Sequence, residues 1–292
     1  MEHWEEVVGL LDLEQAEDDR FVGGHPSSRP PRVFGGQVLA QALCAAGRTA
    51  PADRVVHSLH AYFLAAGTSD SDITFEVERL RDGRSISARR VVAHQGKAPI
   101  FELLASFGQP SEASDRGVRD VGVESPESLQ SLRERLEPFA AEHGGWWVRP
   151  RAFDLRYVDL HPREVMDRPG SPQRRSRVWM KSRGAVPDDR LTRACLLAYL
   201  SDMTLLEPVM IGAGRTTLGP GSIASLDHAM WFHRDVGPSE WLLYDRSLVH
   251  LSAHRGLASG QMLTVDGALV CTVAQEGHLS DRSPLRVGLP ES

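Results

Sequence analysis

The 292-residue sequence has little of what several classes of protein require. It contains only three cysteines, Cys44, Cys195 and Cys271, and they lie far apart, so neither a disulfide framework nor a cysteine-based metal site is predicted. Basic residues are not in excess, because 33 Lys and Arg against 39 Asp and Glu give a formal net charge of −6. A nucleic-acid-binding surface is typically net basic, so we predict no nucleic-acid partner.

Signals for a membrane or for secretion are also missing from the sequence pattern. No apolar run approaches the roughly 20 residues of a membrane-spanning helix. The first residues, MEHWEEVVGLL, are acidic where a secretory signal is basic. We therefore expect a cytoplasmic protein without membrane insertion.

Three common kinds of site lack their sequence signatures. The chain has no G-x-S-x-G motif, which excludes the usual nucleophile turn of an α/β serine hydrolase. The glycines between Ile211 and Gly221 are not followed by the Lys-Ser/Thr pair of a phosphate-binding loop. His57 and His60 are three residues apart in a strand-like segment and are expected on opposite faces. We therefore expect neither a metal nor another cofactor.

The sequence does contain the material of a globular core, with 41% hydrophobic and 25% charged residues. From Phe34 to Gly47 it is rich in alanine and has no Asp or Glu, which predicts a helix buried on most sides and capped by Gly47. From Val55 to Phe107 apolar and polar residues alternate, with turn signals at Asp82-Gly83 and Gln95-Gly96. This pattern predicts antiparallel strands after the helix.

The second half repeats this order of elements. Strands expected near Phe153 to Val158 and Arg177 to Arg183 precede a helix from Asp189 to Asp202, and further strands follow from Ile223. Short matches at nearly constant separation, such as Ser58-Leu59 with Ser225-Leu226, favour a duplicated unit.

A polar segment separates the two halves. It contains one predicted helix, with Ser125 as N-cap and with Leu129, Leu132, Leu136 and Phe139 on one face. The predicted organisation is therefore an N-terminal unit at 1–112, a connecting segment at 113–148 and a C-terminal unit at 149–292. The predicted fold class is α+β.

Asp202 is the most informative polar residue of the sequence. At about 100° per residue of helix, it falls on the same stripe as Leu191 and Cys195. A carboxylate on an apolar stripe costs several kcal/mol unless it is paired or hydrogen-bonded. Asp202 is therefore either a helix-end carboxylate that reaches solvent or a residue of a functional site.

Other polar residues interrupt apolar strands. Gln275 follows the apolar run from Ala268 to Ala274, and Ser225 and His228 lie in the segment IASLDHAMWFH. Gln275 and Ser225 either satisfy backbone groups at strand ends or belong to a site. His228 is either a core histidine or a base.

Basic side chains gather in two short segments despite the acidic total. They form either solvated strand faces or a site for an anionic ligand such as a phosphorylated carrier, for which arginine offers forked donors. The two clusters are Arg79, Arg81, Arg84, Arg89 and Arg90, and Arg174, Arg175, Arg177, Lys181 and Arg183.

Seven segments occur in a specific order along the chain: RVFGGQVLAQAL (Arg32 to Leu43), HSLHAYFL (His57 to Leu64), LRDGRSISARRV (Leu80 to Val91), YLSDMTLL (Tyr199 to Leu206), SLDHAMWFHR (Ser225 to Arg234), EWLLYD (Glu240 to Asp245) and QEG (Gln275 to Gly277). Together they resemble the acyl-CoA thioesterase II family. The resemblance covers most of the chain and is weakest between Pro110 and Gly145. It implies a double hotdog fold, in which each of two tandem units has a central helix wrapped by an antiparallel sheet.

The resemblance also implies hydrolysis of acyl-CoA thioesters to free fatty acid and CoA. The family's Asp, Gln and Thr or Ser, which hold the attacking water, fall on Asp202, Gln275 and Ser225. Serine replaces the family's usual threonine here and lacks the methyl group that stiffens the rotamer. We therefore expect the water to be held more loosely.

Substrate contacts are expected at His228 and at a helix start, where the backbone amides of Gly35, Gly36 and Gln37 are candidate donors to an oxyanion. Only the second of the two central helices carries an acid. We therefore expect one active site per chain, at the junction of the two units.

Two other functions use the same fold. An enoyl-CoA hydratase needs a histidine five residues after the acid, where this chain has Glu207, so hydration is disfavoured. A non-catalytic acyl-CoA sensor is the alternative that stays open. In either case the sheet edges of such units are commonly covered by pairing, so we expect a homo-oligomer.

Overall fold

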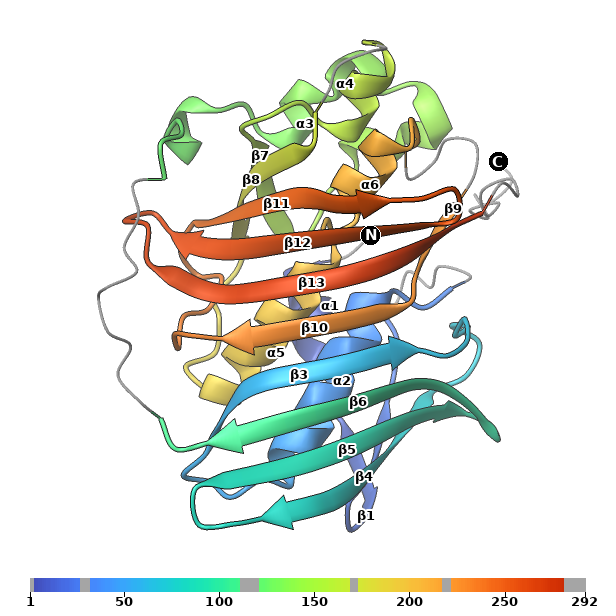
Figure 1. The fold of residues 1–292 in the computed structure, drawn as a ribbon, viewed down its shortest axis with the longest axis vertical. Helices are drawn as coiled ribbons and strands as arrows, with labels where there is room; N and C mark the ends of the chain where they lie inside the picture. Colours follow the sequence, from blue (N-terminus) through green and yellow to red (C-terminus); the bar gives the residue numbers. More distant parts are fainter. Residues whose placement is uncertain (1–2, 27–31, 111–120, 169–172, 217–221, 281–292) are drawn as a thin grey trace.

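The computed structural model describes residues 3–26, 32–110, 121–168, 173–216 and 222–280. Its main feature is a curved antiparallel sheet that wraps two long helices (Figure 1). The strands follow the order β1-β2-β4-β5-β6-β3-β10-β13-β12-β11-β8-β7, and β9 pairs with β13 beside β10. Their bounds are β1 Glu14–Glu17, β2 Arg20–Gly23, β3 Val55–Phe63, β4 Ile73–Asp82, β5 Ile86–Gln95, β6 Ala98–Gly108, β7 Phe153–Tyr157, β8 Arg175–Ser182, β9 Ser222–Ser225, β10 Asp227–Phe232, β11 Leu242–Leu251, β12 Arg255–Thr264 and β13 Leu269–Ser280.

The two long helices, α2 (Gly35–Arg48) and α5 (Arg190–Asp202), pack against each other on the concave side of the sheet. Both are buried along most of their length, as was predicted for the first helix from its lack of Asp and Glu. The shorter helices are α1 (Trp4–Gly9), α3 (Leu132–Arg135), α4 (Pro162–Met166) and α6 (Glu207–Gly212).

The sheet has an internal two-fold relation centred between β3 and β10. These strands pair antiparallel, with Ala229 opposite His60. On either side the order repeats, since β6, β5 and β4 follow β3 while β13, β12 and β11 follow β10. Each half thus has a central helix and an antiparallel sheet, so the α+β prediction with two similar units is confirmed. The predicted unit boundary at 112–113 lies outside the described residues.

The register corrects one of the sequence matches behind the duplication. Val56 of β3 lies opposite Phe107 of β6, as Ser225 of β9 lies opposite Gly277 of β13. The counterpart of Ser225 is therefore Val56 rather than Ser58. A two-residue match carries no register information, so the similarity of Ser58-Leu59 to Ser225-Leu226 is coincidental.

Two predicted helix boundaries were wrong. The helix expected from Ser125 to Phe139 is instead a series of short turns, because Leu129 is extended and Ser131 begins a new helix with its own capping box to Glu134. The first central helix continues past Gly47 through Arg48, whose guanidinium group donates to the carbonyls of Leu11 and Leu13.

The stretch Arg190–Gly212, which comprises α5 and α6, is long and apolar enough to cross a membrane by composition. No such run was expected from the sequence pattern. However, 83% of its most apolar window is buried inside the protein, which is the ordinary environment of a core helix.

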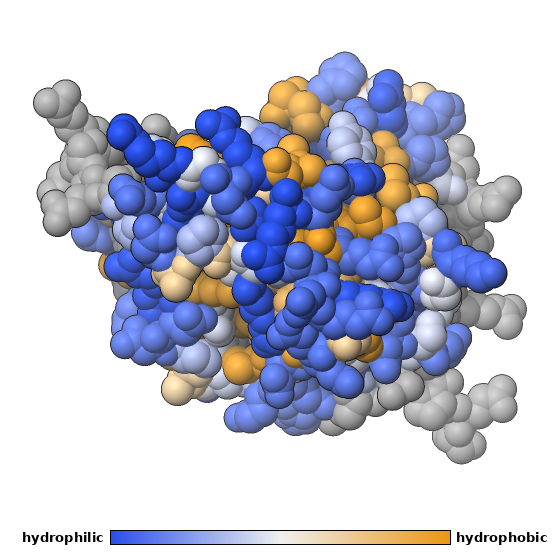
Figure 2. Space-filling model, turned by 90° about the horizontal axis from the view of Figure 1, so that it is seen from below, coloured by the Kyte–Doolittle hydropathy of each residue, from blue (hydrophilic) through white to orange (hydrophobic). Residues whose placement is uncertain are grey.

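Seen from the end of the sheet at β4, the surface is largely hydrophilic with small apolar patches (Figure 2).

Candidate active site

Asp202 is the last residue of α5, and only 5% of its side chain is exposed. Burial raises the pKa of its carboxyl group above the ordinary value, and hydrogen bonds from the Gln275 side chain and the Gly36 backbone partly oppose that rise. Of its two interpretations from sequence, the helix-end carboxylate that reaches solvent is therefore wrong. Asp202 is a buried acid held by neutral donors.

Gln275 lies on the concave face of β13 and is fully buried. Its Nε2 donates to Oδ1 of Asp202 at 2.7 Å. Its Oε1 atom has no hydrogen-bond partner among the described residues. The structure thus brings together two of the residues singled out from sequence, and it leaves one buried acceptor beside the carboxylate.

His228 lies on β10 next to this pair and is 1% exposed. Its Nε2 is 3.0 Å from Oγ of Ser201, while that hydroxyl also lies 2.8 Å from the carbonyl of Ala198. Since Ser201 donates its one proton to Ala198, we assign the proton on the imidazole to Nε2. Burial lowers the pKa of His228 to about 4, so the ring is neutral near pH 7.

This tautomer makes Nδ1 of His228 an acceptor, 4.0 Å from Oδ1 of Asp202. No hydrogen bond of ordinary geometry joins Nδ1 to a described residue, although the Gln275 side chain interacts with the ring and partly opposes the fall in its pKa. Two acceptors this close repel each other unless a donor lies between them. A water molecule with two O–H groups, or a substrate hydroxyl or amide, suits that position.

Ser225 ends β9 and is half-buried. It lies opposite Gly277, two residues beyond Gln275 on β13, so both side chains belong to the same face of the sheet. Such diagonal neighbours are about 7–8 Å apart. No hydrogen bond joins the Ser225 hydroxyl to Asp202 or Gln275 in the described part of the chain, so contact between them would need a bridging molecule.

The start of α2 faces Asp202. A Cβ atom added to Gly35 would lie 2.8 Å from Oδ2 of Asp202 and 2.9 Å from the ring of Phe63. Glycine is therefore required for the backbone to come this close to the carboxylate. The Gly36 backbone hydrogen-bonds to Asp202, which places the positive end of the α2 dipole at this acid.

Gln37, by contrast, is turned away from the carboxylate. Its backbone amide donates to the carbonyl of Phe34 at 3.1 Å. Its side chain donates to the carbonyl of Gly24, also at 3.1 Å, and contacts His25. Of the three amides expected at the helix start, that of Gln37 is thus already engaged within the turn.

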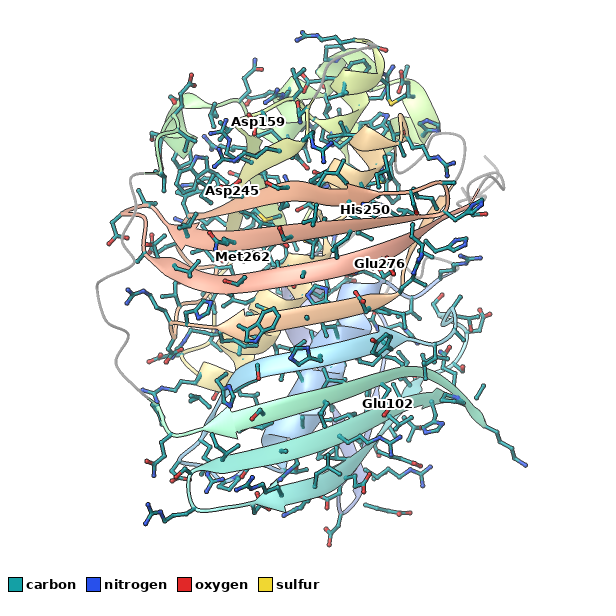
Figure 3. All side chains as sticks on the ribbon, in the orientation of Figure 1. Glu102, Asp159, Asp245, His250, Met262 and Glu276 are labelled. Atoms are coloured by element: carbon teal, nitrogen blue, oxygen red, sulfur yellow. The ribbon has the colours of Figure 1, made fainter. Side chains whose placement is uncertain are left out.

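Several arginines of the basic clusters are paired with acids, including Glu102, Asp159 and Asp245, which are labelled in Figure 3. Arg175 pairs with Asp245, Arg177 with Asp159, and Arg90 with Glu102. These contacts favour solvated strand faces over a ligand site for the exposed arginines. Arg89 departs from both interpretations, because it is fully buried and donates to Thr49 and Asp82.

The described residues contain no group of three or more His, Cys, Asp or Glu side chains suited to a metal ion. His57 and His60, expected on opposite faces of a strand, are both exposed. The reason is a bulge in β3 between Val56 and Ser58, which changes the alternation of side chains.

The sequence did not reveal the residues that support the site through hydrogen bonds and an ion pair. Ser201 contacts His228 through its hydroxyl, and its carbonyl accepts from the Tyr244 hydroxyl at 2.9 Å. Just beyond Asp202, Glu207 forms a buried ion pair with Arg246 at 2.6 Å. The one available signal was Glu207 itself, an acid in the apolar segment LLEPVMI.

Comparison with known proteins gives a consistent result over both halves. Residues 148–278 match a family model described as acyl-CoA thioesterase, and residues 25–108 match one described as acyl-CoA thioesterase N-terminal domain. The chain is 37% identical over 284 residues to acyl-CoA thioesterase 2 of Haemophilus influenzae, covering 93% of this chain and 96% of that protein. It is 32% identical to human acyl-coenzyme A thioesterase 8, covering 93% and 88%.

Solved structures agree with this comparison. The tesB protein of Mycobacterium avium subs paratuberculosis has a TM-score of 0.77 at 36% identity, covering 94% of this chain and 99% of that one. The acyl-CoA thioesterase II TesB2 of Mycobacterium marinum has a TM-score of 0.75 at 34% identity, covering 95% and 99%. A hot dog fold protein of Alicyclobacillus acidocaldarius, 20% identical with a TM-score of 0.73 and coverage of 96% and 98%, supports the fold. The predicted double hotdog is thereby confirmed.

Proposed function

Because the chain belongs to the acyl-CoA thioesterase family and is therefore a thioester hydrolase, we propose that it cleaves acyl-CoA with a water molecule held by Asp202, Gln275 and Ser225. The products are a free fatty acid and CoA. The observation that carries the proposal is the buried pair of Asp202 and Gln275, joined at 2.7 Å beside the start of α2.

In the proposed reaction Asp202 acts as general base. It accepts one proton from the water while the water oxygen bonds to the thioester carbon, and the carbonyl becomes a tetrahedral oxyanion. When the carbon–sulfur bond breaks, the sulfur leaves with the electron pair and receives the proton from Asp202. The raised pKa of Asp202 suits this role, because a base with a pKa nearer to neutrality transfers protons more effectively.

The neighbours of Asp202 orient the water. Nδ1 of His228 is a second acceptor 4.0 Å from the carboxylate, so one water can donate to both and direct a lone pair at the substrate. Gln275 fixes the carboxylate, and the Ser225 hydroxyl, on the same face two positions along the sheet, supplies a further contact. Such positioning of a nucleophile accounts for a large part of catalysis in hydrolases.

The start of α2 supports the developing negative charge. The positive end of its helix dipole lies beside Asp202, where the thioester carbonyl must approach the water. No covalent intermediate is needed in this scheme.

The experiment is thiol release from a panel of acyl-CoAs by wild type and Asp202→Asn. We expect the variant to lose about 10² or more in kcat, the scale for loss of a general base. Its thermal stability should be equal or higher, since the cost of burying a charge is removed. Asp227→Asn is the matched control, because Asp227 is a half-buried acid nearby whose Oδ1 accepts from the Glu276 amide at 2.8 Å, a bond that asparagine retains.

Two results would contradict the proposal in different ways. Wild type that binds acyl-CoA but releases no CoA would support the sensor alternative. Full activity in Asp202→Asn would remove the assigned base and leave the family intact.

A further inference from the structure

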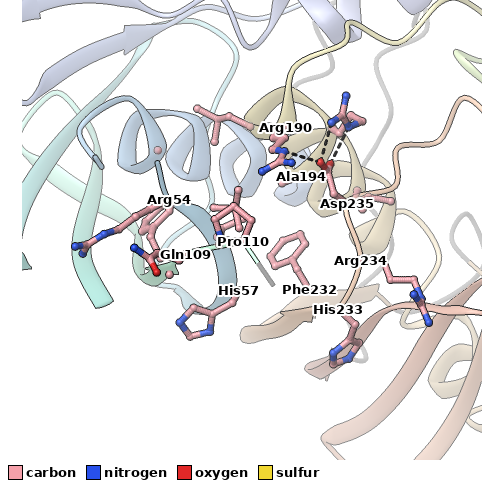
Figure 4. Close-up of a pocket in the computed structure, with 18 of the residues that line it drawn as sticks. Arg54, His57, Gln109, Pro110, Arg190, Ala194, Phe232, His233, Arg234 and Asp235 are labelled. Atoms are coloured by element: carbon pink, nitrogen blue, oxygen red, sulfur yellow. Dashed lines mark hydrogen bonds and ion pairs between the residues drawn. The ribbon is translucent and has the colours of Figure 1, made fainter. Parts of the chain in front are cut away.

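We propose that a second pocket, at the opposite ends of α2 and α5 from Asp202, binds an aliphatic chain with an anionic headgroup and does not hydrolyse it. The pocket has a volume of about 850 Å³ (Figure 4). It lies between the end of α2, the start of α5 and the strands β3, β6 and β10. Asp202, Gln275 and Ser225 do not line it.

This pocket is the two-fold counterpart of the Asp202 site. At one end of the helix pair the last turn of α5 meets the first turn of α2, where a Cβ on Gly35 would touch Asp202. At the other end the last turn of α2 meets the first turn of α5, where a Cβ on Gly47 would lie 2.3 Å from Leu191. When the two helices are aligned at their first residues, Gly47 falls on the position of Asp202.

The strands give the same correspondence. The pair of Ser225 and Gly277 is matched by Val56 and Phe107. Ala229 of β10 lies opposite Ala274 of β13, so the next residues along these strands, His228 and Gln275, also adjoin each other. Their counterparts are Leu59 of β3 and Ala105 of β6, which lie opposite each other.

Each polar group of the Asp202 site thus has an apolar counterpart at the other end of the helix pair, and two of these counterparts, Gly47 and Val56, line the second pocket. A pocket without a carboxylate, an amide or a hydroxyl at these places cannot activate water by the mechanism proposed above. Its volume falls within the roughly 300–1,000 Å³ typical of small-molecule sites. The pocket is therefore suited to hold an apolar chain intact.

The rim of the pocket carries positive charge. Arg54, Arg190, Arg193 and Arg234 line it, against the single acid Asp235. Asp235 is already paired with Arg190 and Arg193, each at 2.9 Å, and Arg193 also pairs with Asp188 at 2.7 Å.

In the close-up, the ring of Phe232 projects into the space between the sides bearing Arg54 and Arg234 (Figure 4). Leu191, Leu197 and Val236 supply further apolar wall. An apolar interior with a rim rich in arginine fits an amphiphile whose head is an anion.

Two ligands share this chemistry, a free fatty acid and a fatty acyl-CoA. The test is isothermal titration of the full chain with dodecanoate and, separately, with the thioether S-dodecyl-CoA, which has no cleavable acyl bond. Arg190→Glu reverses a charge on the rim at a residue whose side chain is 54% exposed, and Ala194→Trp fills the interior. Arg175→Glu is the matched control, since Arg175 is similarly exposed and also paired with an aspartate.

We expect at least one probe to show a binding event that weakens about tenfold or more in Arg190→Glu and in Ala194→Trp, but not in Arg175→Glu. The probe that responds identifies the ligand. Identical isotherms in wild type, Arg190→Glu and the control would overturn the proposal. Because binding is measured directly, this result is independent of whether Asp202 is the catalytic base.

Discussion

At the scale of single residues, Gly35 controls how close the backbone comes to the acid. The first turn of α2 approaches Asp202 only because this position has no side chain. Gly35→Ala should displace the carboxylate or the helix start and lower kcat/KM by about tenfold to a hundredfold, the range for small misplacements of catalytic groups. Gly9→Ala, where a Cβ meets nothing within 4 Å, is the control. Unchanged kinetics in Gly35→Ala would show that the contact with Asp202 is not needed.

The protonation of Asp202 sets the acidic limit of activity. Burial raises its pKa above the ordinary 3.8, and the proposed mechanism needs the carboxylate. As the pH falls through this raised pKa, kcat/KM should fall, with an inflection at a higher pH than an exposed aspartate would give. The pH–rate profile of wild type measures this inflection, which should disappear in Asp202→Asn. An inflection at or below the ordinary pKa would contradict the assignment.

From the sequence alone, His228 could be interpreted as either a core histidine or a base. Its complete burial and lowered pKa of about 4 fit a neutral acceptor rather than a group that gains a proton near pH 7. Only the contact between Ser201 and Ala198 indicates which nitrogen carries the proton, and no spacing in the sequence reveals that contact.

At the scale of elements, the antiparallel packing of α5 and α2 explains why an acid is tolerated at a helix C-terminus. The dipole of α5 disfavours an anion at Asp202. The start of α2 lies beside the same carboxylate and has the opposite sign. The dipole of α2 therefore offsets the unfavourable effect of the α5 dipole on the Asp202 carboxylate.

The chain just after Asp202 is held by a buried ion pair. Glu207 in the first turn of α6 accepts from Arg246 of β11 at 2.6 Å and from the hydroxyl of Tyr157 at 2.7 Å. Glu207→Gln leaves the Arg246 guanidinium buried without its counter-ion, so the free energy of unfolding should fall by about 3–5 kcal/mol. Urea denaturation followed by circular dichroism measures the change.

The matched control is Glu276→Gln, which removes an exposed ion pair to Arg255. That change should cost at most about 1 kcal/mol. Equal stability of the two variants would show that the buried pair does not anchor α6.

At the scale of the whole molecule, one chain contains the arrangement that two identical units would form around a two-fold axis. The seam is the pairing of β3 with β10, together with the contact of α2 and α5. The two ends of the helix pair nevertheless differ, since one end has Asp202 and the other has Gly47. The homo-oligomeric state and the cytoplasmic location stay predictions.

Local periodicity in the sequence was enough to predict the two central helices, the antiparallel strands and the position of Asp202 on an apolar helix stripe. Local patterns also singled out Gln275 as a polar residue after an apolar run, but its expected place at the end of a strand was wrong, since β13 continues to Ser280. The family resemblance implied that Gln275 helps to hold the attacking water. Neither the local patterns nor the resemblance revealed its contact with Asp202.

Only the tertiary structure decided which side chains meet. Gln275 and Asp202 are 73 residues apart, and they touch because β13 pairs in one register over the end of α5. A shift of one residue would turn every side chain of the strand to the opposite face. The same register decides that Val56, and not Ser58, is the counterpart of Ser225, which makes the second pocket apolar where the first is polar.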